Sequence, residues 1–158
     1  MILINGERKN TLDVSDRGFH YGDGLFETIE VIHGRPVFLA QHLARLKSGC
    51  QVLKIPFPSA NLLMDEINQI SKNAEHGVVK LMLTRGSGGR GYRPPEPVYV
   101  TRLVALHPFP EYPESYASLG ISARFCDIRL GISPMLAGIK HNNRLEQVLA
   151  RSEWQDQF

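Results

Sequence analysis

The organisation of the chain is clearest in one segment, Leu25-Phe26-Glu27-Thr28-Ile29-Glu30-Val31-Ile32. Two sets of side chains alternate along it with the period of two that places them on opposite faces of a β-strand. One set is Leu25, Glu27, Ile29 and Val31, and the other is Phe26, Thr28 and Glu30. His33-Gly34 then gives a turn, and Pro36 to Leu39 reads as the returning strand. The segment therefore predicts the first strand of a β-hairpin.

The residues after this hairpin change from a strand period to a helix period. Apolar residues recur at three- and four-residue steps between Ala40 and Leu53. The positions are Leu43, Leu46, Cys50 and Leu53. This spacing predicts a helix with one apolar face, and Arg45 lies off that face, free to do something other than pack.

The remaining elements complete a mixed fold. Ile2 to Ile4 followed by Asn5-Gly6 predicts a short strand and a tight turn. Pro58-Ser59-Ala60 opens a second helix, which we expect to end at Gly77. Strands at Val78–Thr84, Val98–Leu106 and Ile121–Leu130 are expected, with a helix at Asn143–Trp154. This set of elements predicts an α+β fold, a sheet packed with helices.

Composition restricts the class of protein. The chain has 158 residues, 42% apolar and 22% charged, with a net charge of +2, which is typical of a folded globular domain. This near-neutral charge gives no reason to expect nucleic acid or a membrane as partner. Cys50 and Cys126 lack a CxxC partner and are expected to be reduced core residues, which suits the cytoplasm. The six histidines show no metal-ligand spacing, so we expect no metal site.

Lys140 lies in a segment that favours unusual lysine chemistry. Small and apolar residues precede it from Leu136 to Ile139, and a polar, helix-like run follows from His141 to Gln147. Partial desolvation disfavours the ammonium form of a lysine and lowers its pKa, as an amine nucleophile requires. Taken alone, an ordinary surface lysine before a helix explains the same pattern.

Two further features offer groups for an anionic ligand. Arg45 projects from the predicted helix and suits a phosphate or carboxylate, although a solvated arginine looks the same in sequence. The glycine-rich segment Arg85–Arg93 brings N–H groups and arginines but lacks the lysine-Ser/Thr ending of a P-loop. A flexible loop between strands is the plain alternative, and an RNA-binding RGG-like segment is a weaker one.

Together these segments resemble one enzyme family. The residues that carry the resemblance are Leu3-Ile4-Asn5-Gly6, Ser15 to Thr28, His42-Leu43-Ala44-Arg45-Leu46, Arg85 to Tyr92 and Ala137 to Gln147. Across essentially the whole chain they are similar to the fold-type IV (branched-chain aminotransferase-like) pyridoxal-phosphate enzymes, most closely the aminodeoxychorismate lyases of folate biosynthesis. The last two segments separate the lyases from the branched-chain and D-amino-acid transaminases that share the fold.

The resemblance implies a cofactor, a reaction and a set of site residues. Lys140 would bind pyridoxal phosphate covalently and act as the catalytic residue, and Arg45 would contact the cofactor phosphate. The small-molecule substrate would be 4-amino-4-deoxychorismate, and the products 4-aminobenzoate and pyruvate. Arg85, Arg90 and Tyr92 are the expected substrate-binding residues. The family also implies a homodimer.

Members of this family continue past the lysine helix into a second α/β domain. Residues 1–120 are therefore expected to form an N-terminal α+β domain, and residues 121–158 an interdomain strand and the start of the second domain. We expect such a fragment to have little or no lyase activity and to expose apolar surface where the second domain would lie. Two alternatives stay open: a fold-type IV aminotransferase acting on branched-chain or D-amino acids, and a non-catalytic remnant domain.

Overall fold

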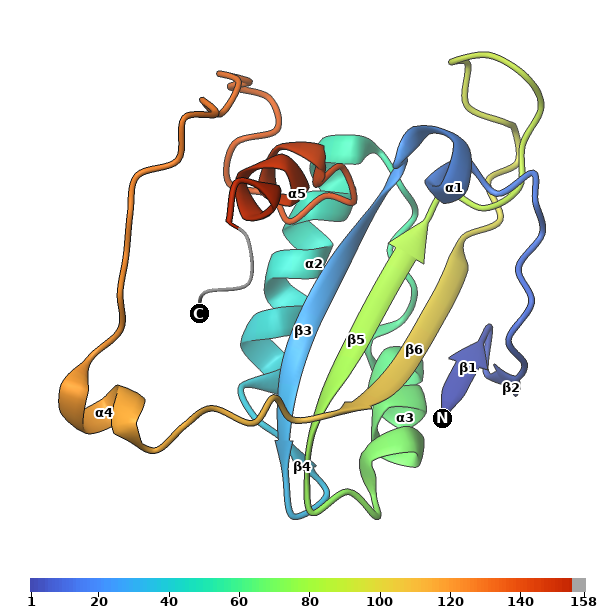
Figure 1. The fold of residues 1–158 in the computed structure, drawn as a ribbon. Helices are drawn as coiled ribbons and strands as arrows, with labels where there is room; N and C mark the ends of the chain where they lie inside the picture. Colours follow the sequence, from blue (N-terminus) through green and yellow to red (C-terminus); the bar gives the residue numbers. More distant parts are fainter. Residues whose placement is uncertain (155–158) are drawn as a thin grey trace.

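The computed structural model describes residues 1–154 and shows one antiparallel sheet with helices (Figure 1). The strands are β1 (Ile2–Ile4), β2 (Glu7–Arg8), β3 (Gly24–Ile32), β4 (Arg35–Pro36), β5 (His76–Thr84) and β6 (Thr101–Pro108). The helices are α1 (Arg17–Tyr21), α2 (Leu39–Leu53), α3 (Ala60–Ser71), α4 (Ser115–Leu119) and α5 (Leu145–Ser152). The strand order is β2-β1-β6-β5-β3-β4, with antiparallel neighbours throughout. The predicted α+β fold is confirmed.

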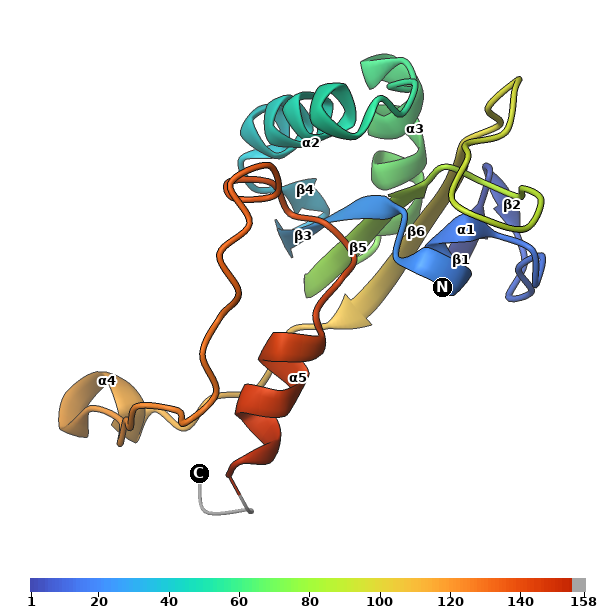
Figure 2. The ribbon, with the colours of Figure 1, turned by 90° about the horizontal axis from the view of Figure 1, so that it is seen from above.

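Helices α2 and α3 cover one face of the sheet, as the view from above shows (Figure 2). The apolar stripes of both helices are buried there, at Leu43, Leu46, Cys50, Leu63, Ile67 and Ile70. Removing such side chains from water contributes about 25 cal/mol per Å² of apolar area, so this layer is the main source of stability. The spacing seen in the sequence therefore corresponds to the core.

Strand β3 connects the core to the rest of the molecule. It pairs with β5 along its whole length, from Gly24 opposite Thr84 to Ile32 opposite His76. Its odd-numbered residues face the helices, and Glu27 is among them with 0% of its surface exposed. The side chain of Phe26 faces the other side of the sheet, toward which α4 and α5 lie in Figure 2.

Three local predictions were wrong. Helix α3 ends at Ser71, because the chain turns there into β5, and Gly77 lies inside that strand. Residues 121–130 form no strand within the described residues, because they run away from the sheet with no strand edge beside them (Figure 1). Cys126 is a free cysteine in this segment and only half-buried, whereas Cys50 is a core residue.

The chain between β6 and the Lys140 segment lies largely outside the core. It carries only the short helix α4 and exposes a series of large apolar side chains. These are Leu119, Ile121, Phe125, Leu130, Ile132 and Met135. The expected exposure of apolar surface is confirmed. Within residues 1–154, no helix has both the length and the apolar character to cross a membrane.

Asp23 fastens the start of β3 to two distant segments. Its carboxylate accepts hydrogen bonds from Arg17 Nε at 3.0 Å and from Arg85 Nε at 2.7 Å. Burial on its own would raise the pKa of Asp23, but the hydrogen bonds from Arg85 and Arg17 outweigh it and lower the pKa. Arg85 also donates to the backbone carbonyls of Leu53 and Lys54, at the end of α2. Asp23 therefore ties β3 to α1 and α2.

Replacing Asp23 with Asn tests this cross-link. The variant leaves two nearly buried guanidinium groups without their anion, so we expect the free energy of unfolding to fall by about 2 kcal/mol. Urea denaturation measures the change. Asp65→Asn, on the exposed side of α3, removes the same charge and should change little. Equal stability of the two variants would contradict the assignment.

The effect of Asp23→Asn should depend on pH. Because the pKa of Asp23 is lowered by folding from its ordinary value of 3.8, its contribution is fully present above that value. The contribution is lost as the pH falls through the lower, folded pKa. Denaturation series at falling pH should therefore show the wild type losing its advantage over the variant only in acid.

Candidate functional site

Lys140 is brought to the sheet by backbone pairing with the edge of β3. Phe26 N donates to Lys140 O at 2.9 Å, and Asn142 N donates to Gly24 O at 3.0 Å. Together they form an isolated antiparallel bridge between Leu25 and His141. Lys140 is therefore fixed at a strand edge, although it is remote in sequence.

Gly24 is required for this close approach. A Cβ atom at Gly24 would lie 2.3 Å from Leu83 O and 2.6 Å from Asn142 Nδ2. Both distances are far below ordinary contact, and the backbone carbonyl on β5 cannot move away without breaking the sheet. The absence of a side chain at this position lets the Lys140 segment pack against β3.

The side chain of Lys140 points over the ring of Phe26. Its Nζ atom lies 4.4 Å from the ring centroid, in the geometry of a cation–π contact. Arg144 Cζ lies 5.2 Å from the same centroid, and Lys80 Nζ lies 5.5 Å from it. Three cationic side chains, one from β5 and two from the Lys140 segment, therefore approach one aromatic ring. We call Phe26, Lys80, Lys140 and Arg144 the Phe26 cluster.

This environment lowers the pKa of Lys140 from its ordinary value of 10.5. Burial is the largest cause, followed by the positive charge of Arg144. Glu27 acts in the opposite direction, and Arg45 and Lys80 add smaller contributions that again lower the pKa. The sign matches the sequence-based expectation, because a lower pKa leaves more of the amine unprotonated and nucleophilic.

Arg45 is held by the buried carboxylate of Glu27. Its Nε donates to Glu27 Oε1 at 2.8 Å and its second terminal nitrogen donates to Oε2 at 2.5 Å. His42 Nδ1 lies 2.8 Å from the same Oε2. The hydrogen bonds to Glu27 raise the pKa of Arg45, so the guanidinium stays charged. Half of the arginine side chain remains exposed, which leaves it available to an anion.

Several polar atoms beside Lys140 are buried without a hydrogen-bond partner. They are His141 Nδ1, both side-chain amide atoms of Asn142, and Arg144 Nε. Such groups cost free energy unless a ligand, water or another segment of protein satisfies them. Their concentration around one lysine is the pattern of an incomplete binding site.

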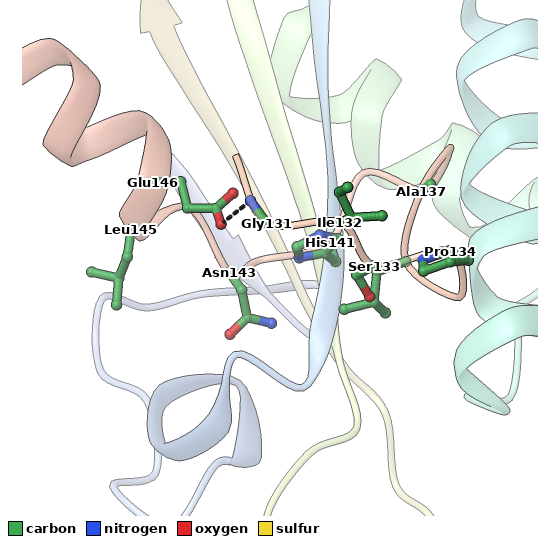
Figure 3. Close-up of a pocket in the computed structure, with 10 residues that line it drawn as sticks. Gly131, Ile132, Ser133, Pro134, Ala137, His141, Asn143, Leu145 and Glu146 are labelled. Atoms are coloured by element: carbon green, nitrogen blue, oxygen red, sulfur yellow. Dashed lines mark hydrogen bonds between the residues drawn. The ribbon is translucent and has the colours of Figure 1, made fainter. Parts of the chain in front are cut away.

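A pocket of about 520 Å³ lies next to these atoms (Figure 3). Residues 131–137 form one side of it, and residues from His141 to Glu146 form the other. Gly131 N donates to Glu146 Oε1 at 2.8 Å and ties the two sides together. The pocket therefore opens beside the residue that follows Lys140. Within residues 1–154, no cluster of acidic, histidine or cysteine side chains could hold a metal ion.

The residues of the glycine-rich segment Arg85–Arg93 have different roles, whereas the sequence suggested a single ligand-binding loop. Arg85 is 6% exposed and uses its guanidinium on Asp23 and on backbone carbonyls, so it is part of the protein framework. Arg90 and Tyr92 are exposed and line a separate pocket with His20 and Tyr21. Lys140 lies within electrostatic range of Glu27 and Arg45, whereas Arg90 and Tyr92 line a different pocket.

Sequence reasoning missed Glu27, Lys80 and Arg144. Glu27 did leave a signal, because it occupies the same register as Leu25 and Ile29, where an apolar residue is expected. Lys80 and Arg144 left none, because each looks like an ordinary surface cation until the chain is folded.

Comparisons with known proteins identify the family of the chain. A family model described as Amino-transferase class IV matches residues 24–158. The chain is 36% identical to the aminodeoxychorismate lyase of Vibrio harveyi over 97% of its own length and 56% of that protein. It is 30% identical to the D-alanine aminotransferase of Bacillus licheniformis over 98% of its own length and 56% of that enzyme.

A crystal structure of 4-amino-4-deoxychorismate lyase from Pseudomonas aeruginosa superimposes with a TM-score of 0.93. The two sequences are 45% identical, and the match covers 99% of this chain and 58% of that one. The chain thus spans a little over half the length of the relatives it matches. It belongs to the class IV amino-transferase family, whose enzymes use pyridoxal phosphate.

Proposed function

We propose that this chain is the lysine-bearing part of an aminodeoxychorismate lyase of folate biosynthesis, which converts 4-amino-4-deoxychorismate to 4-aminobenzoate and pyruvate. The observation that carries the proposal is the position of Lys140. Its amine is partly desolvated beside Phe26, has a lowered pKa, and lies near an arginine that is locked in the charged form. The identity to the Vibrio and Pseudomonas lyases supports the choice of reaction.

The residues fit pyridoxal phosphate. A phosphate dianion needs fixed cations, and Arg45 offers a half-exposed guanidinium that Glu27 orients. An aldehyde reacts with an unprotonated amine, and the lowered pKa of Lys140 increases the unprotonated fraction. The unpartnered atoms of Asn142 and Arg144 are further places for polar contacts. We therefore assign Arg45 to the phosphate and Lys140 to the covalent link.

The chain's own residues account for the proton movements. When bound, pyridoxal phosphate supplies an electron sink for negative charge at the carbon next to the substrate amine. With the cofactor bound, the amine of Lys140 would be placed to accept the proton from that carbon. Loss of the enolpyruvyl group through its carbon–oxygen bond would make the ring aromatic, and the departing enolpyruvate would take up a proton to become pyruvate. The positive charges around Phe26 keep Lys140 ready to lose its own proton.

The exposed residues of the glycine-rich segment are the proposed substrate contacts. Arg90 and Tyr92 remain proposed substrate contacts, because their loop is exposed and cationic. Arg85 is not proposed as a substrate contact, because its donors are used inside the protein.

We also propose a homodimer in the cytoplasm. The exposed apolar residues between Leu119 and Met135 are compatible with further protein surface packing there.

Lys140 should be the residue labelled when the chain is incubated with pyridoxal phosphate and reduced with borohydride. Its lowered pKa leaves more of its amine unprotonated than an ordinary lysine would have. Peptide mass spectrometry locates the label. Lys140→Ala should abolish it, whereas Lys72→Ala, a surface change at the end of α3, should leave it unchanged. Labelling spread evenly over the lysines would count against the proposal.

The pH dependence of this labelling should respond to Arg144. The charge of Arg144 disfavours the Lys140 ammonium, so Arg144→Gln should raise the pKa of Lys140 toward its ordinary value of 10.5. The labelling rate as a function of pH should then shift to higher pH. Arg151→Gln, on the last turn of α5, removes an equal charge and serves as the control. An unshifted profile for Arg144→Gln would show that the two charges do not interact.

The reaction type can be read from the products. We expect a fusion of these 158 residues with the remaining part of the Pseudomonas enzyme to release pyruvate and 4-aminobenzoate without an amino acceptor. Lys140→Ala in that fusion should reduce the rate by about 10³-fold or more. The 158-residue chain assayed alone should give little product. Formation of a keto acid that requires an amino acceptor would favour an aminotransferase, in line with the similarity to the Bacillus enzyme.

A further inference from the structure

The Phe26 cluster carries more positive charge than its surroundings balance. Lys80, Lys140 and Arg144 approach the same ring, yet none of them forms an ion pair with a carboxylate within residues 1–154. The nearby carboxylate of Glu27 is already held by Arg45 and His42. The three cations are therefore left with an aromatic face as their common neighbour.

An aromatic face compensates for little of this charge. A cation–π contact at a partly exposed site stabilises its cation only weakly, whereas each of these cations repels the other two. The lowered pKa of Lys140, to which Arg144 and Lys80 both contribute, records that repulsion. In addition, Arg144 Nε is buried without a partner. An anion placed between these groups would relieve the repulsion and satisfy the orphaned donor.

Lys80 is open to a ligand from the solvent side. It is exposed at the middle of β5, opposite Thr28 on β3 and Ala105 on β6. Neither paired neighbour is charged or bulky, and the ammonium group stays open to solvent beside the ring of Phe26. Arg45, in contrast, rises from α2 on the helix-covered side and is bound to the buried Glu27. The two cationic groups therefore lie on different sides of β3.

We infer that Lys80 and Arg144, both beside the ring of Phe26, form a carboxylate-binding subsite for the substrate. This inference rests on the proposed function and adds a specificity-determining residue to it. A dicarboxylic substrate needs a cationic contact beyond the one used for the cofactor phosphate. Lys80 supplies it from the open face of the sheet, next to the amine of Lys140. The apolar ring of Phe26 provides a flat surface against which an unsaturated ring can lie.

Chorismate is the probe for this subsite, because it carries both carboxylates of the proposed substrate but no amine. A carboxylate bound beside Lys140 favours its ammonium form, so chorismate should shift the titration of Lys140 to higher pH. The titration is measured on the 158-residue chain without cofactor, from the pH dependence of Lys140 acetylation at constant ionic strength. The chorismate concentration that gives half of the shift reports the affinity.

Lys80→Gln should weaken this response by about tenfold, as expected for the loss of one charge-assisted contact. Lys80→Arg should restore it, and Lys72→Gln, at the far end of the sheet, should leave it unchanged. Circular dichroism would check that each variant is folded. A full chorismate response in Lys80→Gln, or none in the wild-type chain, would overturn the inference.

Inorganic phosphate tests whether these cations bind a phosphate group rather than a carboxylate. If phosphate shifts the Lys140 titration as strongly as chorismate, and Lys80→Gln removes both shifts, the subsite binds phosphate and the inference is wrong. Borohydride labelling with pyridoxal phosphate is run in parallel on Lys80→Gln. Retained labelling of Lys140 with an unchanged chorismate response would refute the subsite alone, whereas loss of labelling in the wild-type chain would refute the proposed function.

Discussion

Two backbone hydrogen bonds along the edge of β3 hold the candidate site together. They join Phe26 to Lys140 and Asn142 to Gly24, and they fix a segment that otherwise has few neighbours in the fold. Backbone pairing sets position and register at once, because a shift by one residue would turn Lys140 to the opposite side. Gly24 makes the pairing possible by leaving room for Asn142. Without this contact the lysine would lie in an exposed loop.

The same strand organises the electrostatics on both of its faces. On the helix side, Glu27 is fully buried and holds Arg45 and His42. On the other side, Phe26 gathers the cations of Lys80, Lys140 and Arg144. One carboxylate within a group of cations produces an overall positive site with a fixed geometry. Such a site attracts anions and at the same time lowers the pKa of the lysine amine that would react.

Arginines of similar appearance in the sequence have different tasks in the structure. Arg85 lies in the glycine-rich loop and looked like a ligand contact, but Asp23 and two carbonyls use its donors. Arg45 was predicted from the sequence to contact the cofactor phosphate, and it has the half-exposed, charged guanidinium that an anion needs. What separates them is the position of one buried carboxylate near each. That position depends on strand pairing, which brings residues distant in sequence into contact.

The sequence by itself determined the sheet and the two helices that cover it, and it singled out Lys140 as the candidate reactive lysine. Period-two alternation from Leu25 and the apolar stripe of α2 are local patterns that burial enforces, so they could be read directly. Residues 121–130 show the limit, because a strand-like pattern forms no strand where no edge is available to pair with it. Only the tertiary structure decided that Lys80 and Arg144 join Lys140 over Phe26, and that Arg85 does not. The physical reason is that charge interactions act through space, and the distances they depend on are set by the pairing of β3 with β5 and with the Lys140 segment.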